Sequence, residues 1–245
     1  MELKELIYRR KSTRSYTDTP VAEQTLQKIR DFMATAVPLD PSIRVRWDIV
    51  PRSQVKCLCP WTTPQLLTIY TEDREGALMN VGFLFQQADL YLNALGLGTC
   101  WLGMGRMNEK AAVPPSDAEG LSFAIMLAFG YPKGPHLREN RSEFRRKAPS
   151  EIADRPDERL EPARFAPSSV NSQPWFFTHE RDVLHAYCAE KGGFFKSKGL
   201  SDMNRIDMGI ALAHLFVSHP DTFRFFRTES APEVKGRRYV GSITL

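Results

Sequence analysis

Several features that would assign a function at once are missing from this sequence. Its four cysteines and five histidines are spread over 245 residues and lack the spacing of a disulfide framework, a zinc site or a His-based triad. Cys57 and Cys59 are close together, but no second pair or nearby histidine completes a tetrahedral metal site. Residues 1–6 contain no apolar signal core, and the apolar run 121–129 is too short for a bilayer of roughly 30 Å. We therefore expect no metal, no membrane and a cytoplasmic location.

A dinucleotide-binding fingerprint is absent too. Gly96-Leu97-Gly98 lacks the third glycine and follows a predicted helix, whereas the fingerprint follows a strand. This excludes a Rossmann interpretation.

The basic charge of the chain is modest and local. The net charge is +4, and the excess lies in two clusters: Arg9, Arg10, Lys11 and Arg14; Arg138, Arg141, Arg145, Arg146 and Lys147. Two short clusters suit a small anionic ligand better than a long polymer. No recognition helix or RNA-binding aromatic motif accompanies them, so we expect no nucleic-acid partner, an expectation that salt-sensitive retention on DNA would reverse.

The length and the 42% hydrophobic content allow one large domain or two small, intimately packed ones. In the first part of the chain, apolar periodicity predicts helices over 3–9, from Thr19 through Met33, and over 75–95. Strands are predicted over 44–50, 66–71 and 121–129. The helix over 75–95 is apolar nearly all round, which is typical of a buried helix.

The second part repeats this order at a nearly constant spacing. Trp47 corresponds to Trp175, and Gly82 in the long helix corresponds to Gly209. Residues 160–165 take the place of the helix that ends at Met33, and residues 183–189 take the place of the strand 66–71. A helix that begins near Asn204 matches the helix 75–95, and residues 239–245 match the closing strand 121–129. This order favours a duplication, in which both parts of the chain share one order of helices and strands. The alternative is that any two halves that mix helices and strands look alike when only the order of their elements is compared.

Two short runs resemble the flavin-binding signatures of the nitroreductase family. They are Arg10-Lys11-Ser12-Thr13-Arg14 and Ala166-Pro167-Ser168-Ser169-Val170-Asn171-Ser172-Gln173-Pro174-Trp175. The resemblance implies an α+β, nitroreductase-like fold in which two subunit-like halves, 1–150 and 151–245, are fused in one chain, with central antiparallel sheets flanked by helices. It also implies a monomer that mimics the homodimer usual in this family.

The resemblance assigns roles to thirteen residues. Arg10, Lys11 and Ser12 would bind the FMN phosphate, and Arg14 would lie near the pyrimidine end of the ring. Trp101, Leu102 and Gly103 belong to a run that resembles the loop whose backbone N–H reaches flavin N5. Arg145 and Arg146 either return to the phosphate or form a solvated basic loop. The residues expected at the uracil-like edge are Pro167, Ser168, Asn171 and Gln173.

Each half carries only one part of this site. Residues 37–47, which precede Trp47, contain no asparagine or glutamine, and the second half has neither an arginine-serine arm nor a Gly-Leu-Gly-Thr run. The expectation is therefore one FMN per chain, held in a cleft between the halves.

The resemblance further implies a reaction. NADH or NADPH would reduce FMN, and a nitroaromatic or quinone-like acceptor would then be reduced in the same pocket, with no protein acid, base or nucleophile required. Residues 61–63 and 192–195 are candidates for substrate contacts, or the aromatic pair in the second segment belongs to the core. The alternative is a flavin-binding protein without turnover, serving as a sensor or store.

Overall fold

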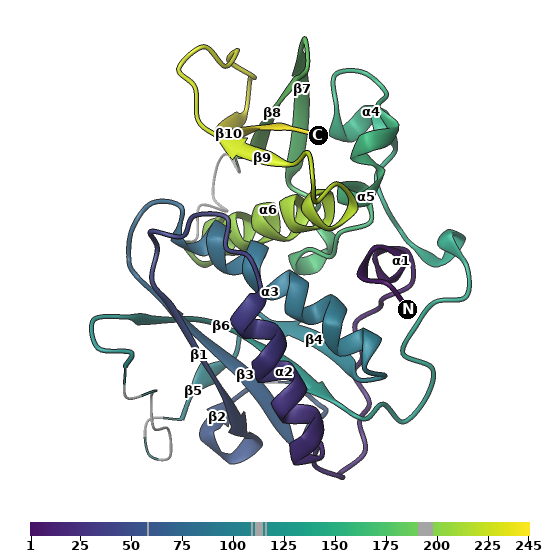
Figure 1. Ribbon diagram of the computed structural model, residues 1–245, viewed down its shortest axis with the longest axis vertical. Coiled ribbons are helices and arrows are strands. Elements are labelled where there is room, and N and C mark those ends of the chain that lie inside the picture. Colours follow the sequence, from purple (N-terminus) through teal and green to yellow (C-terminus); the bar gives the residue numbers. More distant parts are fainter. Residues whose placement is uncertain (58, 109, 111–114, 116, 191–197) are drawn as a thin grey trace. The chain divides into compact units, whose positions relative to one another are not determined.

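A computed structural model describes residues 1–57, 59–108, 110, 115, 117–190 and 198–245, with side chains in the last segment described from Asp202 onward (Figure 1). The chain divides into two compact units. Unit 1 comprises Met1–Ala77 and Gln87–Glu143, and unit 2 comprises Leu78–Gln86 and Phe144–Leu245. Residues 192–195, expected near the substrate, lie outside the described residues. Within the described part of the chain, no helix combines the length and the apolar character that crossing a membrane requires.

Unit 1 is built around a four-stranded antiparallel sheet of order β1-β3-β6-β4. Its strands are β1 (Val45–Pro51), β3 (Gln65–Thr71), β4 (Gly98–Leu102) and β6 (Ser122–Gly130). A second small sheet pairs β2 (Val55–Lys56) with β5 (Arg106–Met107). The helices are α1 (Leu3–Ile7), α2 (Glu23–Thr35) and α3 (Ala77–Ala94), of which Leu78–Gln86 belongs to unit 2.

The sequence pattern predicts most of these elements correctly. In α2, Leu26, Ile29 and Met33 recur at helical spacing and are all buried, as expected of an amphipathic helix. The helix itself begins at Glu23, a few residues after the expected start. The prediction for Gly96–Gly103 needs correction, because Gly98–Leu102 is an edge strand that pairs with β6. Gly96 alone, with φ of 81°, makes the left-handed turn that follows α3.

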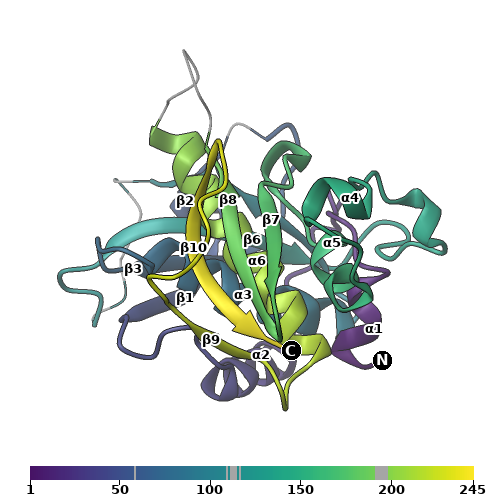
Figure 2. The same ribbon diagram turned by 90° about the horizontal axis from the view of Figure 1, so that it is seen from above.

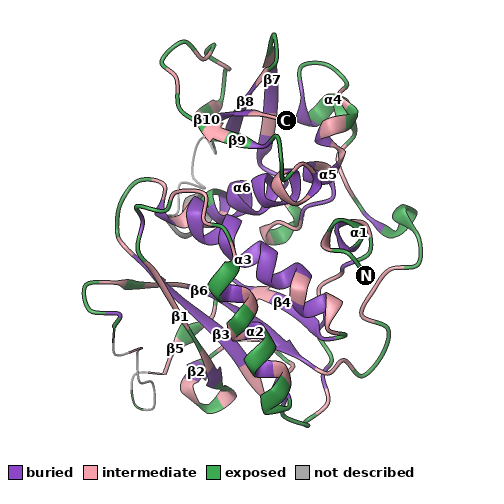
Figure 3. Cartoon of the chain, viewed as in Figure 1, coloured by how far each residue is buried: buried purple, intermediate pink, exposed green. Residues whose placement is uncertain are grey.

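Unit 2 contains the second antiparallel sheet, of order β7-β8-β10-β9 (Figure 2). Its strands are β7 (Trp175–Glu180), β8 (Val183–Ala189), β9 (Arg224–Phe226) and β10 (Arg237–Thr244). Its helices are α4 (Pro149–Ile152), α5 (Glu161–Arg164) and α6 (Lys198–Ser218). Helix α6 packs against α5, β7 and β8, and Figure 3 shows α6 and β8 largely buried. The helix expected over 160–165 is only one turn long, because Pro167 follows shortly after Arg164 and cannot continue a helix.

The two sheets share one topology. In each, the first two strands form a hairpin-like pair, a long helix follows, and the fourth strand inserts between the second and the third. Both also carry a β-bulge in the same strand pair, beside Tyr70 in unit 1 and between Tyr239 and Gly241 in unit 2. Counted from these bulges, Trp175 is equivalent to Val45 and not to Trp47, because the hairpins differ in length. The expected correspondence of the two tryptophans is therefore wrong by two residues, which is one repeat of the pleated strand.

Within unit 2, the segment Leu78–Gln86 of α3 meets α6 at backbone contact distance. A Cβ on Gly82 would lie 2.0 Å from the Ile206 carbonyl oxygen, and a Cβ on Gly209 would lie 1.9 Å from that of Met79. The two contacts are reciprocal, because each glycine faces the residue three positions before the other. His214 is fully buried beside them, where its ring nitrogens contact Gln86 Nε2 at 3.2 Å and the Pro162 carbonyl at 3.0 Å. It is a core histidine whose two ring nitrogens both have polar contacts.

Candidate functional site

The arm that follows α1 lies along the outer edge of β4 in unit 1. Ser12 bridges to Thr99, and the Thr13 N–H donates to the Thr99 carbonyl at 2.7 Å. Gly98 makes this approach possible, since a Cβ there would lie within 2.7 Å of three atoms of the Thr13 side chain. The arm is thereby fixed as an additional strand-like segment, and Lys11, Ser12 and Arg14 sit on it at defined positions.

Arg10 begins the arm and is held by a buried polar network. Its side chain is 2% exposed, and Nε lies 2.9 Å from Oδ2 of the fully buried Asp89 on α3. The Asp89 Oδ1 accepts a hydrogen bond of 2.5 Å from Thr99, which also accepts one from Asn93. No residue in the described segments accepts a hydrogen bond from Arg10 Nη2. Arg10 therefore ties the arm to α3 and still has one buried donor group to offer.

Further cations gather around this arm. Arg9 is exposed, Arg138 donates to the Arg10 carbonyl, and burial together with the charge of Arg10 lowers the Arg138 pKa. Burial and the charges of Lys11 and Arg9 lower the pKa of His136 in the same way. Within the described parts of the chain, neither Lys11 nor Arg14 forms an ion pair. The positive charge is thus concentrated and incompletely neutralised, which is the electrostatic requirement for binding an anion.

The other predicted residues of unit 1 lie at the far end of β4. Trp101 is half-buried and pairs with Leu127, Leu102 is buried, and the following Gly103 is exposed. Next to them, burial raises the pKa of the Cys100 thiol against the charges of Arg14 and Arg10 and a hydrogen bond with Ser12. The arm that carries Ser12 and Arg14 thus runs beside β4, the strand that leads into Trp101–Gly103.

In unit 2, the basic run at 145–147 and the run at 167–175 form one hydrogen-bonded substructure. Arg146 Nη1 donates to Asn171 Oδ1 at 2.7 Å, and Asn171 Nδ2 donates to the Arg145 carbonyl at 2.8 Å. The Lys147 N–H donates to Gln173 Oε1 at 2.8 Å, while Lys147 Nζ donates to the Gln173 carbonyl at 2.8 Å. The basic run is therefore not a solvated loop. Its Arg146 and Lys147 hold the side chains of Asn171 and Gln173 in place.

The backbone of this loop adopts unusual conformations. Val170, Asn171 and Gln173 have φ values of 48°, 57° and 47°, in the left-handed region that favours glycine. Val170 is β-branched and 83% exposed, so its own side chain gains nothing from burial in this conformation. Strained residues of this kind persist where surrounding bonds determine the backbone, and they cluster at functional sites.

The bonds that hold the loop come partly from residues outside the predicted site. Asp207 on α6 is 3% exposed and accepts hydrogen bonds from the Ser169 N–H at 3.0 and 3.1 Å. Ser168 Oγ accepts from the Gln173 N–H at 2.9 Å, and Pro167 opens the loop. An acidic residue flanked by apolar neighbours within a helix signals such a partner, and both Asp207 and Asp89 fit that signal. The Arg145 side chain is exposed and forms no ion pair with any described residue.

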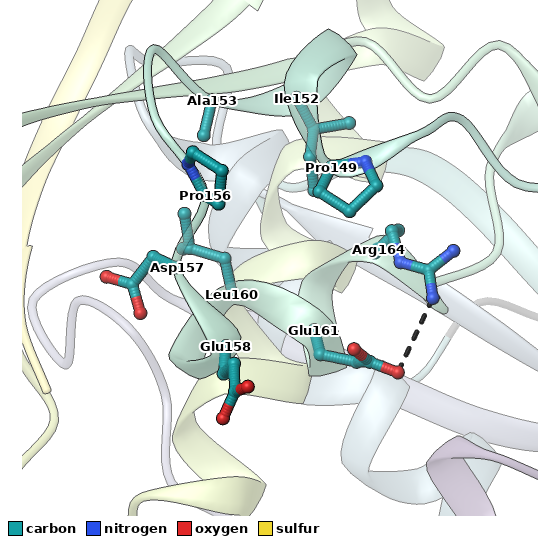
Figure 4. A pocket seen from close by; sticks show the side chains of 9 residues that line it. All are labelled: Pro149, Ile152, Ala153, Pro156, Asp157, Glu158, Leu160, Glu161 and Arg164. Carbon is teal, nitrogen blue, oxygen red and sulfur yellow. Dashed lines mark hydrogen bonds and ion pairs between the residues drawn. The ribbon is translucent and has the colours of Figure 1, made fainter.

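A small pocket in unit 2 is separate from these residues (Figure 4). It has a volume of about 90 Å³ and is lined by Pro149, Ile152, Ala153, Pro156, Asp157, Glu158, Leu160, Glu161 and Arg164. None of the residues predicted to bind a cofactor lines it. Sites for ligands of cofactor size are cavities of about 300–1,000 Å³, so this pocket is too small for a flavin.

Comparison with known proteins identifies the family. A family model described as "Putative TM nitroreductase" matches residues 2–219. The chain belongs to this nitroreductase family. The resemblance recognised in the two short runs is thereby confirmed over most of the chain. No curated protein matches it significantly.

Solved structures of nitroreductases are similar as well. A putative nitroreductase from Thermotoga maritima MSB8 matches with a TM-score of 0.68 and 19% identity, covering 100% of this chain and 94% of that one. A nitroreductase family protein from Clostridium difficile 630 matches with a TM-score of 0.48 and 20% identity, covering 62% of this chain and 96% of that one. A nitroreductase with bound FMN from Bacteroides fragilis NCTC 9343 matches with a TM-score of 0.44 and 18% identity, covering 57% of this chain and 94% of that one. The first of these likenesses confirms the mixed fold of helices and antiparallel sheets over the whole chain.

Proposed function

We propose that this protein is an FMN-dependent oxidoreductase of the cytoplasm that uses NADH or NADPH to reduce a small nitroaromatic or quinone-like acceptor. The observation that carries the proposal is the cationic arm of unit 1 in a chain that belongs to the nitroreductase family. FMN, when bound, supplies the two-electron chemistry. The protein residues bind and orient it, which agrees with the lack of a catalytic triad in the sequence.

The arm supports phosphate binding. Lys11 and Arg14 have no ion-pair partner among the described residues, Ser12 offers a hydroxyl, and Arg10 Nη2 is a buried donor without an acceptor there. A phosphate with nearly two negative charges is stabilised by several converging charge-assisted hydrogen bonds. Asp89 pairs with Arg10, which leaves Lys11 and Arg14 without an ion-pair partner in the described parts of the chain.

The loop of unit 2 supports recognition of the ring edge. Asn171 and Gln173 already donate to and accept from the basic run, so Arg146 and Lys147 act as positioning residues in this proposal. The Ser168 hydroxyl and the exposed Arg145 guanidinium are the groups left to face a ligand. At β4, the backbone of Trp101–Gly103 is assigned to flavin N5, and the Arg14 charge would stabilise negative charge on the reduced ring.

The stoichiometry in the proposal is one FMN per monomeric chain. It follows from a duplication in which each half has kept a different set of motifs. The shared strand order, the bulges in the same strand pair and the reciprocal contact of Gly82 and Gly209 support such a duplication. In this proposal, residues 1–150 and 151–245 descend from two copies of one subunit.

The first test is the visible absorption spectrum of the purified protein, with released flavin quantified against chain concentration and native mass. One FMN per monomeric chain is the expected result, and two would contradict the loss of the second site. Lys11→Ala should weaken FMN binding about 10- to 100-fold, the effect of one charge-assisted hydrogen bond. Lys28→Ala on the exposed face of α2 is the matched control and should leave binding unchanged. Equal effects of the two variants would refute the role of the arm.

Turnover separates the proposal from its alternative, a flavin-binding sensor or store. Under anaerobic conditions, NADH or NADPH should bleach the bound flavin within seconds, and a nitroaromatic or quinone should restore its colour. Persistent colour with both reductants would favour the binding protein over the enzyme.

A further inference from the structure

Two thiols in unit 1 lie within reaction distance of each other. Cys57 and Cys59 follow strand β2, and their sulfur atoms are 2.7 Å apart, joined by a hydrogen bond. A disulfide requires about 2.05 Å, so the sulfurs need to approach by less than one ångström. Residues two apart in a chain are separated by no more than about 7 Å between Cα atoms, close to the range that a disulfide spans.

The surroundings distinguish this pair from the other two cysteines. Cys57 and Cys59 are half-buried, whereas Cys100 and Cys188 are 4% and 5% exposed. Both cysteines pack against the apolar cluster that contains Val55, Leu102 and Met126. Small solutes can therefore reach Cys57 and Cys59 but not the two core thiols.

We infer that Cys57 and Cys59 form a redox-active dithiol that closes to an internal disulfide in exchange with a small disulfide such as that of glutathione. This function is independent of the flavin. It gives the chain a second two-electron couple located in unit 1.

The geometry gives the two sulfurs different roles. The Cys59 N–H donates to Cys57 Sγ at 3.4 Å, and Cys57 Sγ donates to Cys59 Sγ. Burial and the neighbouring Cys57 raise the pKa of Cys59 to about 12, so Cys59 keeps its proton until the second step. Cys57 is therefore the attacking sulfur and Cys59 the resolving one.

The exchange is balanced as follows. The Cys57 thiolate attacks one sulfur of the small disulfide, whose S–S bond breaks and releases one thiolate. That thiolate takes the Cys59 proton, and the Cys59 sulfur then attacks the Cys57 sulfur and expels the second small thiolate, which takes up from solvent the proton that Cys57 had released. Two protein thiols are oxidised, and one small disulfide is reduced to two thiols.

The test is a titration of the intact protein in glutathione buffers of stepped redox ratio, followed by acid quenching, alkylation and peptide mass spectrometry. We expect Cys57 and Cys59 to lose both alkylation sites together as an internal disulfide, while Cys100 and Cys188 remain thiols. Thiols at 57 and 59 that stay alkylatable in the most oxidising buffer would overturn the inference. So would two separate glutathione adducts or a disulfide between two chains.

Single variants test the order of attack. Cys59→Ser should trap one glutathione adduct on Cys57, and Cys57→Ser should form its adduct at least 10-fold more slowly. Cys100→Ser is the matched control and should titrate as the unaltered protein does. Equal rates for the first two variants would overturn the assignment of Cys57 as the attacking sulfur. The titration of the unaltered protein decides the inference even where a variant fails to fold.

Discussion

Replacing Gly209 by alanine tests the closest helix contact of unit 2. The added methyl carbon would lie 1.9 Å from the Met79 carbonyl oxygen and 2.7 Å from the Phe83 backbone nitrogen. Both neighbours are helix backbone, so no side chain can rotate out of the way. To restore contact at 3.4 Å or more, the two helices would have to separate locally by about 1.5 Å.

The expected magnitude follows from two opposing effects. Overpacking a rigid core costs typically about 1–3 kcal/mol, and a contact between two backbones belongs at the upper end of that range. Alanine in a helix interior recovers about 1 kcal/mol relative to glycine. The net loss is therefore about 2 kcal/mol, which lowers the Tm of a chain of this size by roughly 4–8 °C.

The assay is thermal and urea unfolding followed by far-UV circular dichroism. Gly134→Ala is the control, because Gly134 has open space for a Cβ and an ordinary backbone φ. It should change stability by less than about 1 kcal/mol, in the stabilising direction. Gly82→Ala should match Gly209→Ala, and the double variant should lose less than the sum, since one separation of the helices accommodates both methyl groups. A Gly209→Ala protein as stable as the original would refute the backbone contact.

Two further predictions concern charged residues of unit 2. Burial opposes ionisation of Asp157, but hydrogen bonds from Arg159 and His179 outweigh it and lower the Asp157 pKa to about 2. Because the pKa of Asp157 is lower in the folded state, the ionised side chain contributes about 1–2 kcal/mol to the free energy of unfolding. This contribution is present above the unfolded-state pKa near 3.9 and is lost as pH falls toward 2. Asp157→Asn should therefore lower the urea midpoint at pH 7 and converge with the unaltered protein near pH 2; a constant difference would contradict this linkage. Arg146→Ala should lose about 1–2 kcal/mol of stability and also weaken FMN binding, whereas Arg145→Ala should weaken FMN binding alone. Identical unfolding curves for these two variants would show that Arg146 does not hold the loop.

The sequence predicts the elements whose burial is periodic or complete. Strand β8 is found at the expected bounds, and α3 within two residues, since apolar residues are spread along the full length of each. Strand β4 is missed because it begins at Gly98, directly after the turn that ends α3, so the same glycines serve both elements. The short α5 is overpredicted because Leu160, Ala163 and Phe165, three apolar residues within six positions, do not distinguish one helical turn from a longer helix.

The candidate site is predictable in its residue types but not in its internal bonding. The arm and the loop are visible as motifs, because cations, a hydroxyl and amides stand at fixed spacing. Their supports are Asp89, Asp207 and Lys147, which lie far away in sequence or outside the motif. Pairings over such distances depend on tertiary packing, which local sequence patterns do not record. The left-handed backbone at Val170 has no local signal either, since a β-branched residue favours the opposite assignment.

The strain at Val170 gives a way to ask whether the loop is preorganised. Its side chain is 83% exposed, so replacing it by asparagine, which tolerates φ near 50°, removes strain without removing packing. Val170→Asn should raise stability by about 1 kcal/mol, measured by urea unfolding, and leave FMN affinity unchanged, because bonds from Arg146 and Asp207 still fix Asn171 and Ser169. Val170→Thr, equally β-branched, is the control and should show no gain. A loss of stability in Val170→Asn would mean that the loop backbone is not held in the left-handed region, and the positions of Asn171 and Gln173 would then have to be set by the ligand.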